Sequence, residues 1–170
     1  MKILIMHLSD MHFISSDNYK KENIDRIVAA LNSSIANIKH ILIVVSGDLS
    51  NSGKKSEYTK VRHFFADLKQ CIFERYRVQD IRYVMVPGNH DMDYEIGVGD
   101  RHRDGLEILQ LENNYDNEIK SELLKMEQFF LLAGQYNCFG NRNLLHKKTI
   151  IYHGFKIMIN LVNTAILRQN

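Results

Sequence analysis

Six side chains that can bind a metal ion or move a proton lie in three short segments of the sequence. They are Asp10 and His12, then Asp48, and finally Asn89, His90 and Asp91. Carboxylate, imidazole and amide oxygen are ligands that suit divalent ions such as Mn, Zn or Fe(II). A carboxylate can also bridge two such ions, and a pair of ions promotes in-line attack at phosphorus. A phosphate ester is therefore the natural substrate for this set of residues.

Each of the three segments directly follows a short apolar run that is typical of a buried strand. The runs cover residues 2–8, 41–46 and 81–86, and the last ends at the chain's single proline and a glycine. Between them, residues 19–38 carry apolar side chains at helical spacing, and a second helical pattern begins near Ser56. The order strand, helix, strand, helix, strand predicts an α/β fold with parallel strands flanked by helices.

The parallel arrangement predicts where the polar segments lie. Because ligands bind outside the carboxyl ends of parallel strands, we expect the three loops to deliver their side chains to one edge of the sheet. The alternative is that these are ordinary turn residues, since Asp and Asn favour turns and helix caps. All three loops carry such residues, and this agreement favours a functional site.

The second half of the sequence breaks the strand and helix rhythm. Residues 92–140 are first polar and then helical around residues 118–132, which indicates a helical cap or insertion beside the site. Residues 149–162 have the pattern of a hairpin that turns near His153 and Gly154.

The composition narrows the class of protein. The 170 residues suit one domain, and a net charge of +2 gives no reason to expect a partner that is a nucleic acid or a membrane surface. Two distant cysteines indicate reduced thiols. The apolar start is too short for a signal peptide, and no run reaches the roughly 20 apolar residues of a membrane span. We therefore expect a cytoplasmic protein.

Three motifs in this order resemble the first signature blocks of the calcineurin-like metallophosphoesterases. They are SDMH, SGDLSNSG and VPGNHD. The residues of the first two motifs are most similar to those of the bacterial branch with cyclic-nucleotide phosphodiesterase and nuclease relatives. The resemblance implies that residues 1–170 are a single truncated domain. Its fold would be the N-terminal part of the family's α-β-β-α sandwich, with an incomplete second sheet and an insertion at about residues 92–140.

The resemblance also implies a ligand set for two divalent ions, which would be Mn, Fe or Zn. Asp10 and His12 resemble ligands of the first ion. Asp48 resembles the carboxylate that bridges both ions, and Asn89 resembles a ligand of the second.

The two residues after Asn89 resemble the family's catalytic pair. His90 resembles the residue that contacts the phosphate and can protonate the leaving oxygen. Asp91 resembles the acid that orients this imidazole. The family completes its site with a further histidine and a GHxH block. The histidines after Asp91 are His102, His146 and His153, and none of them stands in a GHxH block. His153 could replace one ligand, although its YHGF setting favours a hairpin turn.

The resemblance thus predicts a phosphoesterase that hydrolyses phosphate mono- or diesters, with this chain as an incomplete fragment. We expect weak metal occupancy and weak or no activity of the chain alone, because the second ion keeps few ligands. Nucleotides, cyclic nucleotides and nucleic acids are the implied substrates. The alternative is a non-catalytic scaffold or binding module of the same fold. An incomplete second sheet also predicts self-association through exposed sheet edges.

Overall fold

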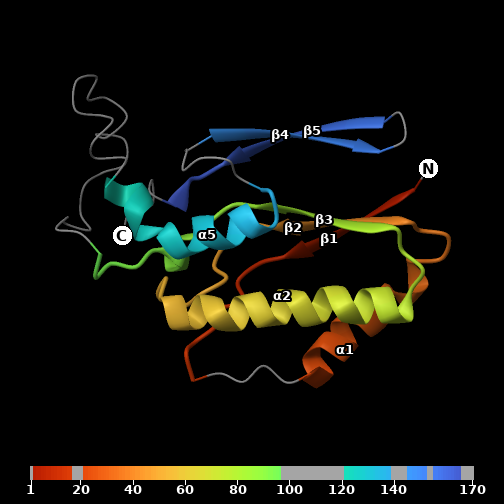
Figure 1. Cartoon of the computed structure of the whole chain (residues 1–170), viewed down its shortest axis with the longest axis horizontal. Coiled ribbons are helices and arrows are strands. Elements are labelled where there is room, and N and C mark those ends of the chain that lie inside the picture. The colour runs from red at the N-terminus through yellow and green to blue at the C-terminus, as the bar shows by residue number, and fades with distance from the viewer. Residues whose placement is uncertain (1, 17–20, 97–120, 139–144, 153–154, 166–170) are drawn as a thin grey trace.

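Three parallel strands form the central sheet of the structure (Figure 1). In this computed structural model the described residues are 2–16, 21–96, 121–138, 145–152 and 155–165. The strands are β1 (Ile3–Leu8), β2 (His40–Val45) and β3 (Asp80–Met85), in the order β1-β2-β3. They pair in register, so that Leu8 lies beside Val45 and Val45 beside Met85. All three strands therefore end level, and the loops that follow them leave from one edge.

The middle strand is buried because its sequence is apolar on both sides. Ile41 and Ile43 are fully buried, and Leu42 and Val45 are nearly so. A continuous β-branched run suits a parallel strand that is covered on both faces. The three predicted strands are present, each within one residue of the expected limits.

Two helices cover one face of the sheet (Figure 1). They are α1 (Lys21–Ala30) and α2 (Lys55–Arg75). Their core-facing side chains share helical spacing and are buried: Ile24, Val28, Tyr58, Val61, Phe64, Phe65, Leu68 and Ile72. The strand and helix order matches the prediction, so the site loops are fixed by a packed α/β core.

The first helix is shorter than its apolar pattern predicts. It ends at Ala30 and continues only as the short 3-10 helix η1 (Leu31–Ser33). Asn and Ser are poor helix formers, and Asn37 adopts a left-handed φ of 63°. The apolar residues Ile35 and Ile38 are nevertheless buried in the core. The pattern thus identified the buried residues but misplaced the end of the helix.

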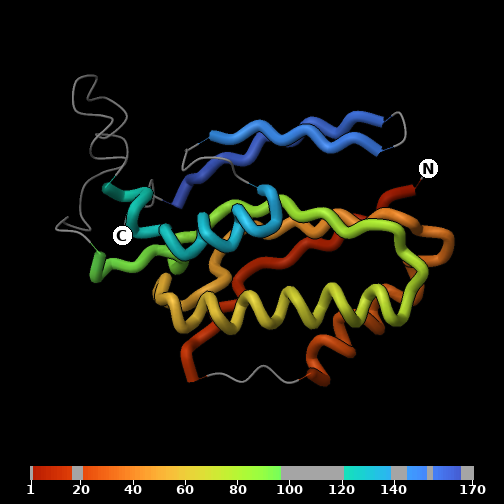
Figure 2. Tube along the Cα trace, viewed as in Figure 1, coloured from red at the N-terminus to blue at the C-terminus, as the bar shows by residue number. Residues whose placement is uncertain are grey.

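An antiparallel hairpin lies over the other face of the sheet (Figures 1 and 2). It consists of β4 (Leu145–Tyr152) and β5 (Phe155–Val162). The predicted hairpin is confirmed, although β4 begins before residue 149, and residues 153–154 at its turn lie outside the described residues. Ile150 is buried while Met158 is 75% exposed, so one face packs on the sheet and the other is open.

The described part of the predicted insertion is helical from residue 121 to residue 135, apart from a turn at Met126. Residues 121–125 form a helical turn, and α5 (Glu127–Gln135) follows and contacts α2. The helix expected over residues 118–132 is interrupted at Met126 and continues to Gln135, where the fully buried Ala133 holds the last turn. Residues 97–120 lie outside the described residues. In the described part of the chain, none of the helices is long and apolar enough to span a bilayer.

Candidate metal centre

The loops after the three strands are joined to one another by backbone hydrogen bonds. The Asp10 amide donates to the Gly47 carbonyl at 3.2 Å, and the His12 amide donates to the Asp48 carbonyl at 3.0 Å. The loop after β1 thus runs beside the loop after β2. This pairing brings the first two predicted metal-binding segments together at the carboxyl edge of the sheet.

The backbone is in the left-handed region at all three candidate ligands in these loops. The φ angles are 54° at Asp10, 46° at His12 and 53° at Asp48. For residues with a β-carbon this conformation costs roughly 1–2 kcal/mol each. Such strain persists only where surrounding structure imposes it, and it gathers at functional sites.

The three side chains converge as a set of metal ligands. Asp10, His12 and Asp48 each offer one ligand atom, and these atoms lie within 4.8 Å of one another. Two ligands on opposite sides of one divalent ion lie about 4 Å apart, so small side-chain rotations would close the set on an ion. Two carboxylate oxygens and one imidazole nitrogen also match the preferences of Mn, Zn and Fe(II). The residues present therefore fit a divalent ion.

Close approach of the second and third loops depends on two glycines. A β-carbon on Gly47, which has a φ of 105°, would lie 2.5 Å from the Gly88 nitrogen. A β-carbon on Gly88 would lie 2.5 Å from the Asp48 nitrogen and would overlap its Oδ1. Because both glycines lack that atom, the His90 amide can donate to Asp48 Oδ1 at 2.9 Å. The turn after β3 thereby holds the Asp48 carboxylate in place.

His90 also belongs to this cluster through its ring. The imidazoles of His12 and His90 meet edge to face, with centroids 4.6 Å apart. Its Nδ1 lies 2.8 Å from the Asn51 carbonyl oxygen. A carbonyl only accepts, so Nδ1 carries a proton, and Nε2 has no hydrogen-bond partner among the described residues. Asn89 stands directly before it at the start of η2 (Asn89–Asp91).

The carboxylate of Asp91 is fully buried beneath the loops. Its Oδ1 accepts hydrogen bonds from the Tyr58 hydroxyl at 2.7 Å and from the Ser50 amide and hydroxyl at 3.0 and 3.1 Å. Its Oδ2 accepts from the Gly88 amide at 2.9 Å. Burial raises the pKa of the Asp91 carboxyl, and these hydrogen bonds oppose that rise. Asp91 therefore ties the turn after β3 to the loop after β2 and to α2.

The structure places Asp91 beneath the turn that carries His90, and the role expected for Asp91 stays a prediction. The Asn51 carbonyl is the partner of the ring, while the Asp91 side chain points into the core. Asp91 accepts from four donors below the turn, three of them on Oδ1 and one on Oδ2. Any influence of Asp91 on His90 passes through the position of the turn.

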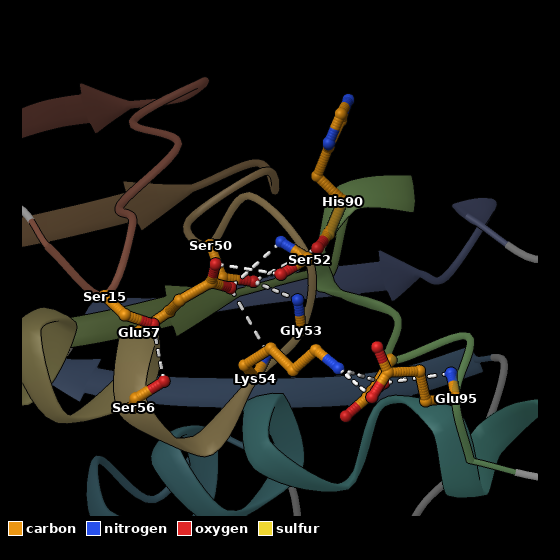
Figure 3. A network of polar contacts seen from close by, with 10 residues as sticks. Ser15, Ser50, Ser52, Gly53, Lys54, Ser56, Glu57, His90 and Glu95 are labelled. Atoms are coloured by element: carbon orange, nitrogen blue, oxygen red, sulfur yellow. Dashed lines mark hydrogen bonds and ion pairs between the residues drawn. The ribbon is translucent and has the colours of Figure 1, made fainter.

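The loop after β2 is also fastened to the start of α2, by residues that the sequence did not single out (Figure 3). The buried carboxylate of Glu57 accepts from the Ser52 amide and hydroxyl, both at 2.9 Å, and from the Lys54 amide at 3.2 Å. Lys54 forms ion pairs with Asp93 at 3.6 Å and with Glu95. The sequence could have revealed this contact, because Glu57 lies in the first turn of the helix that follows GDLSNSG, where an acid often accepts from free backbone amides.

The fold and the site together define a mixed α/β domain with a candidate metal centre at its strand ends. The family model of the calcineurin-like phosphoesterases matches residues 3–169, and the chain belongs to this family. Its parallel sheet flanked by helices and its small antiparallel sheet agree with a metallophosphoesterase domain.

One curated relative is named "Probable cyclic nucleotide phosphodiesterase" and comes from Moraxella catarrhalis (strain BBH18). It is 27% identical over 107 residues, which cover 61% of this chain and 33% of that protein. The chain thus spans about a third of the length of this relative. No solved structure matches the chain.

Proposed function

We propose that this chain carries part of the active site of a phosphoesterase that hydrolyses phosphate mono- or diesters with two divalent ions. The observation that carries the proposal is the convergence of Asp10, His12 and Asp48, whose ligand atoms lie within 4.8 Å of one another. The name of the relative, a probable cyclic nucleotide phosphodiesterase, favours a cyclic nucleotide as the substrate.

Each candidate ligand has a proposed place. Asp10 and His12 would hold the first ion, Asp48 both ions, and Asn89 the second. When bound, the ions supply positive charge that neutralises the phosphate and lower the pKa of a water molecule. The choice of manganese rests on the oxygen-rich donor set. A cytoplasmic location rests on the sequence alone.

We assign His90 the role of proton donor to the leaving oxygen. The Asn51 carbonyl, 2.8 Å from Nδ1, fixes the ring and keeps a proton on that atom. The proton that is transferred is therefore held at Nε2. Asp91 is a positioning residue, because its hydrogen bonds with the Ser50 and Gly88 amides fix the turn that carries His90 relative to the loop after β2.

The test measures manganese per chain after loading and desalting, together with turnover of bis(p-nitrophenyl) phosphate. The Asp48→Asn variant removes the charge proposed to face both ions. We expect it to lose bound manganese and to lower turnover by at least about a hundredfold. Asp25→Asn, an exposed change on α1, is the matched control and should keep both properties. Unchanged manganese content and turnover in Asp48→Asn would defeat the proposal.

The same experiment decides between an enzyme and a scaffold. Manganese that binds in an Asp48-dependent manner without turnover, in a protein that also carries the family's further histidine and GHxH block, would favour a non-catalytic module. Turnover that follows the manganese content would favour the enzyme.

Self-association through sheet edges is a separate proposal. In the described part of the chain β1 and β3 form the two edges of the parallel sheet. The outer face of the hairpin exposes Ile151 by 63% and Met158 by 75%. Light scattering at increasing concentration should show a rising mass, and a constant monomer mass would remove this proposal.

A further inference from the structure

The two carboxylates of the candidate metal centre are each held by the protein through one oxygen. Asp48 Oδ1 accepts from the His90 amide at 2.9 Å. Asp10 Oδ2 accepts from the hydroxyl of its neighbour Ser9. Among the described residues, no hydrogen bond reaches the other oxygen of either carboxylate. Each carboxylate therefore has one oxygen that a donor fixes and one that is open to an ion.

The open oxygen of Asp10 is the one that lies near another candidate ligand. Its Oδ1 is 4.0 Å from His12 Nε2. This separation is too long for a hydrogen bond, and it suits two atoms that bind the same ion at about 2.0–2.2 Å each. Ser9 thus holds Asp10 by the oxygen that is not needed for the ion.

The direction of the Asp10 side chain depends on this one hydrogen bond. The backbone of Asp10 is fixed, because its φ is 54° and its amide donates to the Gly47 carbonyl. The side chain, in contrast, is 67% exposed. An exposed carboxylate can occupy several rotamers unless a hydrogen bond selects one of them. In the described part of the chain, the Ser9 hydroxyl is the only hydrogen-bond donor to this carboxylate.

The two carboxylates differ in what would release them. The donor to Asp48 is a backbone amide in a turn that packing holds, so no side-chain substitution removes it. The donor to Asp10 is a side chain, and Ser9 is exposed. An exposed hydroxyl exchanges its hydrogen bond with water and contributes little to folding. A substitution at Ser9 can therefore disturb the metal centre without disturbing the fold.

We propose that Ser9 is a positioning residue of the metal centre, an inference that rests on the proposed function. Its hydroxyl occupies Asp10 Oδ2 and leaves Asp10 to bind an ion through Oδ1 alone. Carboxylates that bind metals are themselves held by such outer hydrogen bonds, and loss of one typically lowers metal affinity by about 10- to 100-fold. Ser9 sets the direction of a ligand and is not itself a ligand.

The test measures manganese affinity from the electron paramagnetic resonance of free Mn²⁺. We expect Ser9→Ala to bind manganese at least about tenfold more weakly, while the metal-free protein unfolds in urea like the parent. Ser9→Thr keeps the hydroxyl and should restore the affinity. Ser15→Ala is the matched control and should bind like the parent. Ser15 is also exposed and lies after β1, and its hydroxyl pairs with that of Ser56 at 2.6 Å.

A double-mutant cycle tests whether Ser9 acts through Asp10. In the Asp10→Ala background, Ser9→Ala should cause no further loss of affinity, because the carboxylate that it orients is absent. The proposal is overturned if Ser9→Ala binds manganese like the parent, if Ser9→Thr loses as much affinity as Ser9→Ala, or if the effects of Ser9→Ala and Asp10→Ala add.

The Asp48→Asn variant, measured alongside, separates this proposal from the proposed function. Manganese that is lost in Asp48→Asn but kept in Ser9→Ala would overturn only the role of Ser9. A parent protein that binds no manganese, or an Asp48→Asn variant that binds it like the parent, would overturn both.

Discussion

Two pairs of histidine and aspartate lie at opposite ends of the same parallel sheet and differ in almost every physical respect. At the carboxyl end, His12 Nε2 and Asp10 Oδ1 are 4.0 Å apart, and the side chains are 37% and 67% exposed. At the amino end, His40 Nδ1 and Asp80 Oδ1 are 2.6 Å apart, and the side chains are 8% and 29% exposed. The same residue types therefore form an exposed, separated pair (the open pair) at one end and a buried, hydrogen-bonded pair (the closed pair) at the other.

Further contacts complete the closed pair. Arg82 Nε binds the second oxygen of Asp80 at 2.7 Å. The ring of Tyr152 on β4 lies against both side chains, 4.5 Å from the Arg82 guanidinium carbon and 4.9 Å from the His40 ring. Burial by itself would raise the pKa of Asp80, but the hydrogen bonds from His40 and Arg82 outweigh it and lower that pKa. This end of the sheet is a structural clamp between the sheet and the hairpin.

The backbone conformation also differs between the two pairs. Asp10 and His12 have left-handed φ angles, whereas His40 and Asp80 begin regular strands. Strain combined with incomplete pairing marks residues that are kept for a ligand, while full pairing without strain marks residues that hold the fold. The contrast teaches that the residue type alone does not separate the two roles.

Among substitutions that test the contrast between the two ends of the sheet, His90→Asn is expected to have the largest effect, which is on turnover. Loss of the proton donor should lower turnover of the phosphodiester probe by about 10²- to 10⁴-fold. Manganese content and the free energy of unfolding should stay close to the parent values. His63→Asn on the exposed side of α2 is the control. Parent-like turnover in His90→Asn would exclude this residue from the chemistry.

A large effect on stability is expected for Asp91→Asn. The amide keeps only one acceptor oxygen for four donor contacts, so buried donors lose their partners. We expect the free energy of unfolding in urea to fall by about 3 kcal/mol. Tyr58→Phe should cost about 1 kcal/mol, and the double variant should show coupling between the two sites. Additive effects would indicate that the hydroxyl and the carboxylate do not interact.

The effect of Gly88→Ala should be somewhat smaller in stability but should reach the metal centre. The new β-carbon would displace Asp48, so we expect a loss of about 2 kcal/mol and of bound manganese. Gly134→Ala is the control in α5, because a β-carbon there meets nothing within 4 Å. It should raise stability by up to about 1 kcal/mol. Equal behaviour of the two variants would show that the glycine contact is dispensable.

The smallest effect is expected at the closed end, for Asp80→Asn. Because the pKa of Asp80 is lowered by His40 and Arg82, its stabilisation is present above the ordinary value of 3.8 and disappears as pH falls through the folded-state value. The variant should be about 1–2 kcal/mol less stable at neutral pH, and the two proteins should converge in strong acid. Turnover should not change. A difference in stability that persists at acid pH would contradict the assigned cause.

The comparison also shows why some features were predictable from the sequence. Continuous apolar runs such as that of β2 located the strands, and their parallel order placed Asp10, Asp48 and His90 at one edge. The partners of Asp91 were not predictable, since Tyr58 lies 33 residues away on a helix whose rotation only packing determines. The end of α1 was missed for a similar reason. Apolar spacing continues through Ile35 and Ile38 whether or not the backbone is helical.

The left-handed backbone at Asp10, His12 and Asp48 has a consequence for protein engineering. A stabilisation procedure that scores only backbone preference would place glycine at each of these positions, because glycine alone adopts this conformation without strain. The backbone strain at these positions would be relieved. The designed protein would also lose the candidate metal ligands in the loops after β1 and β2, so the three positions that such a procedure would change first are the ones that it must leave alone.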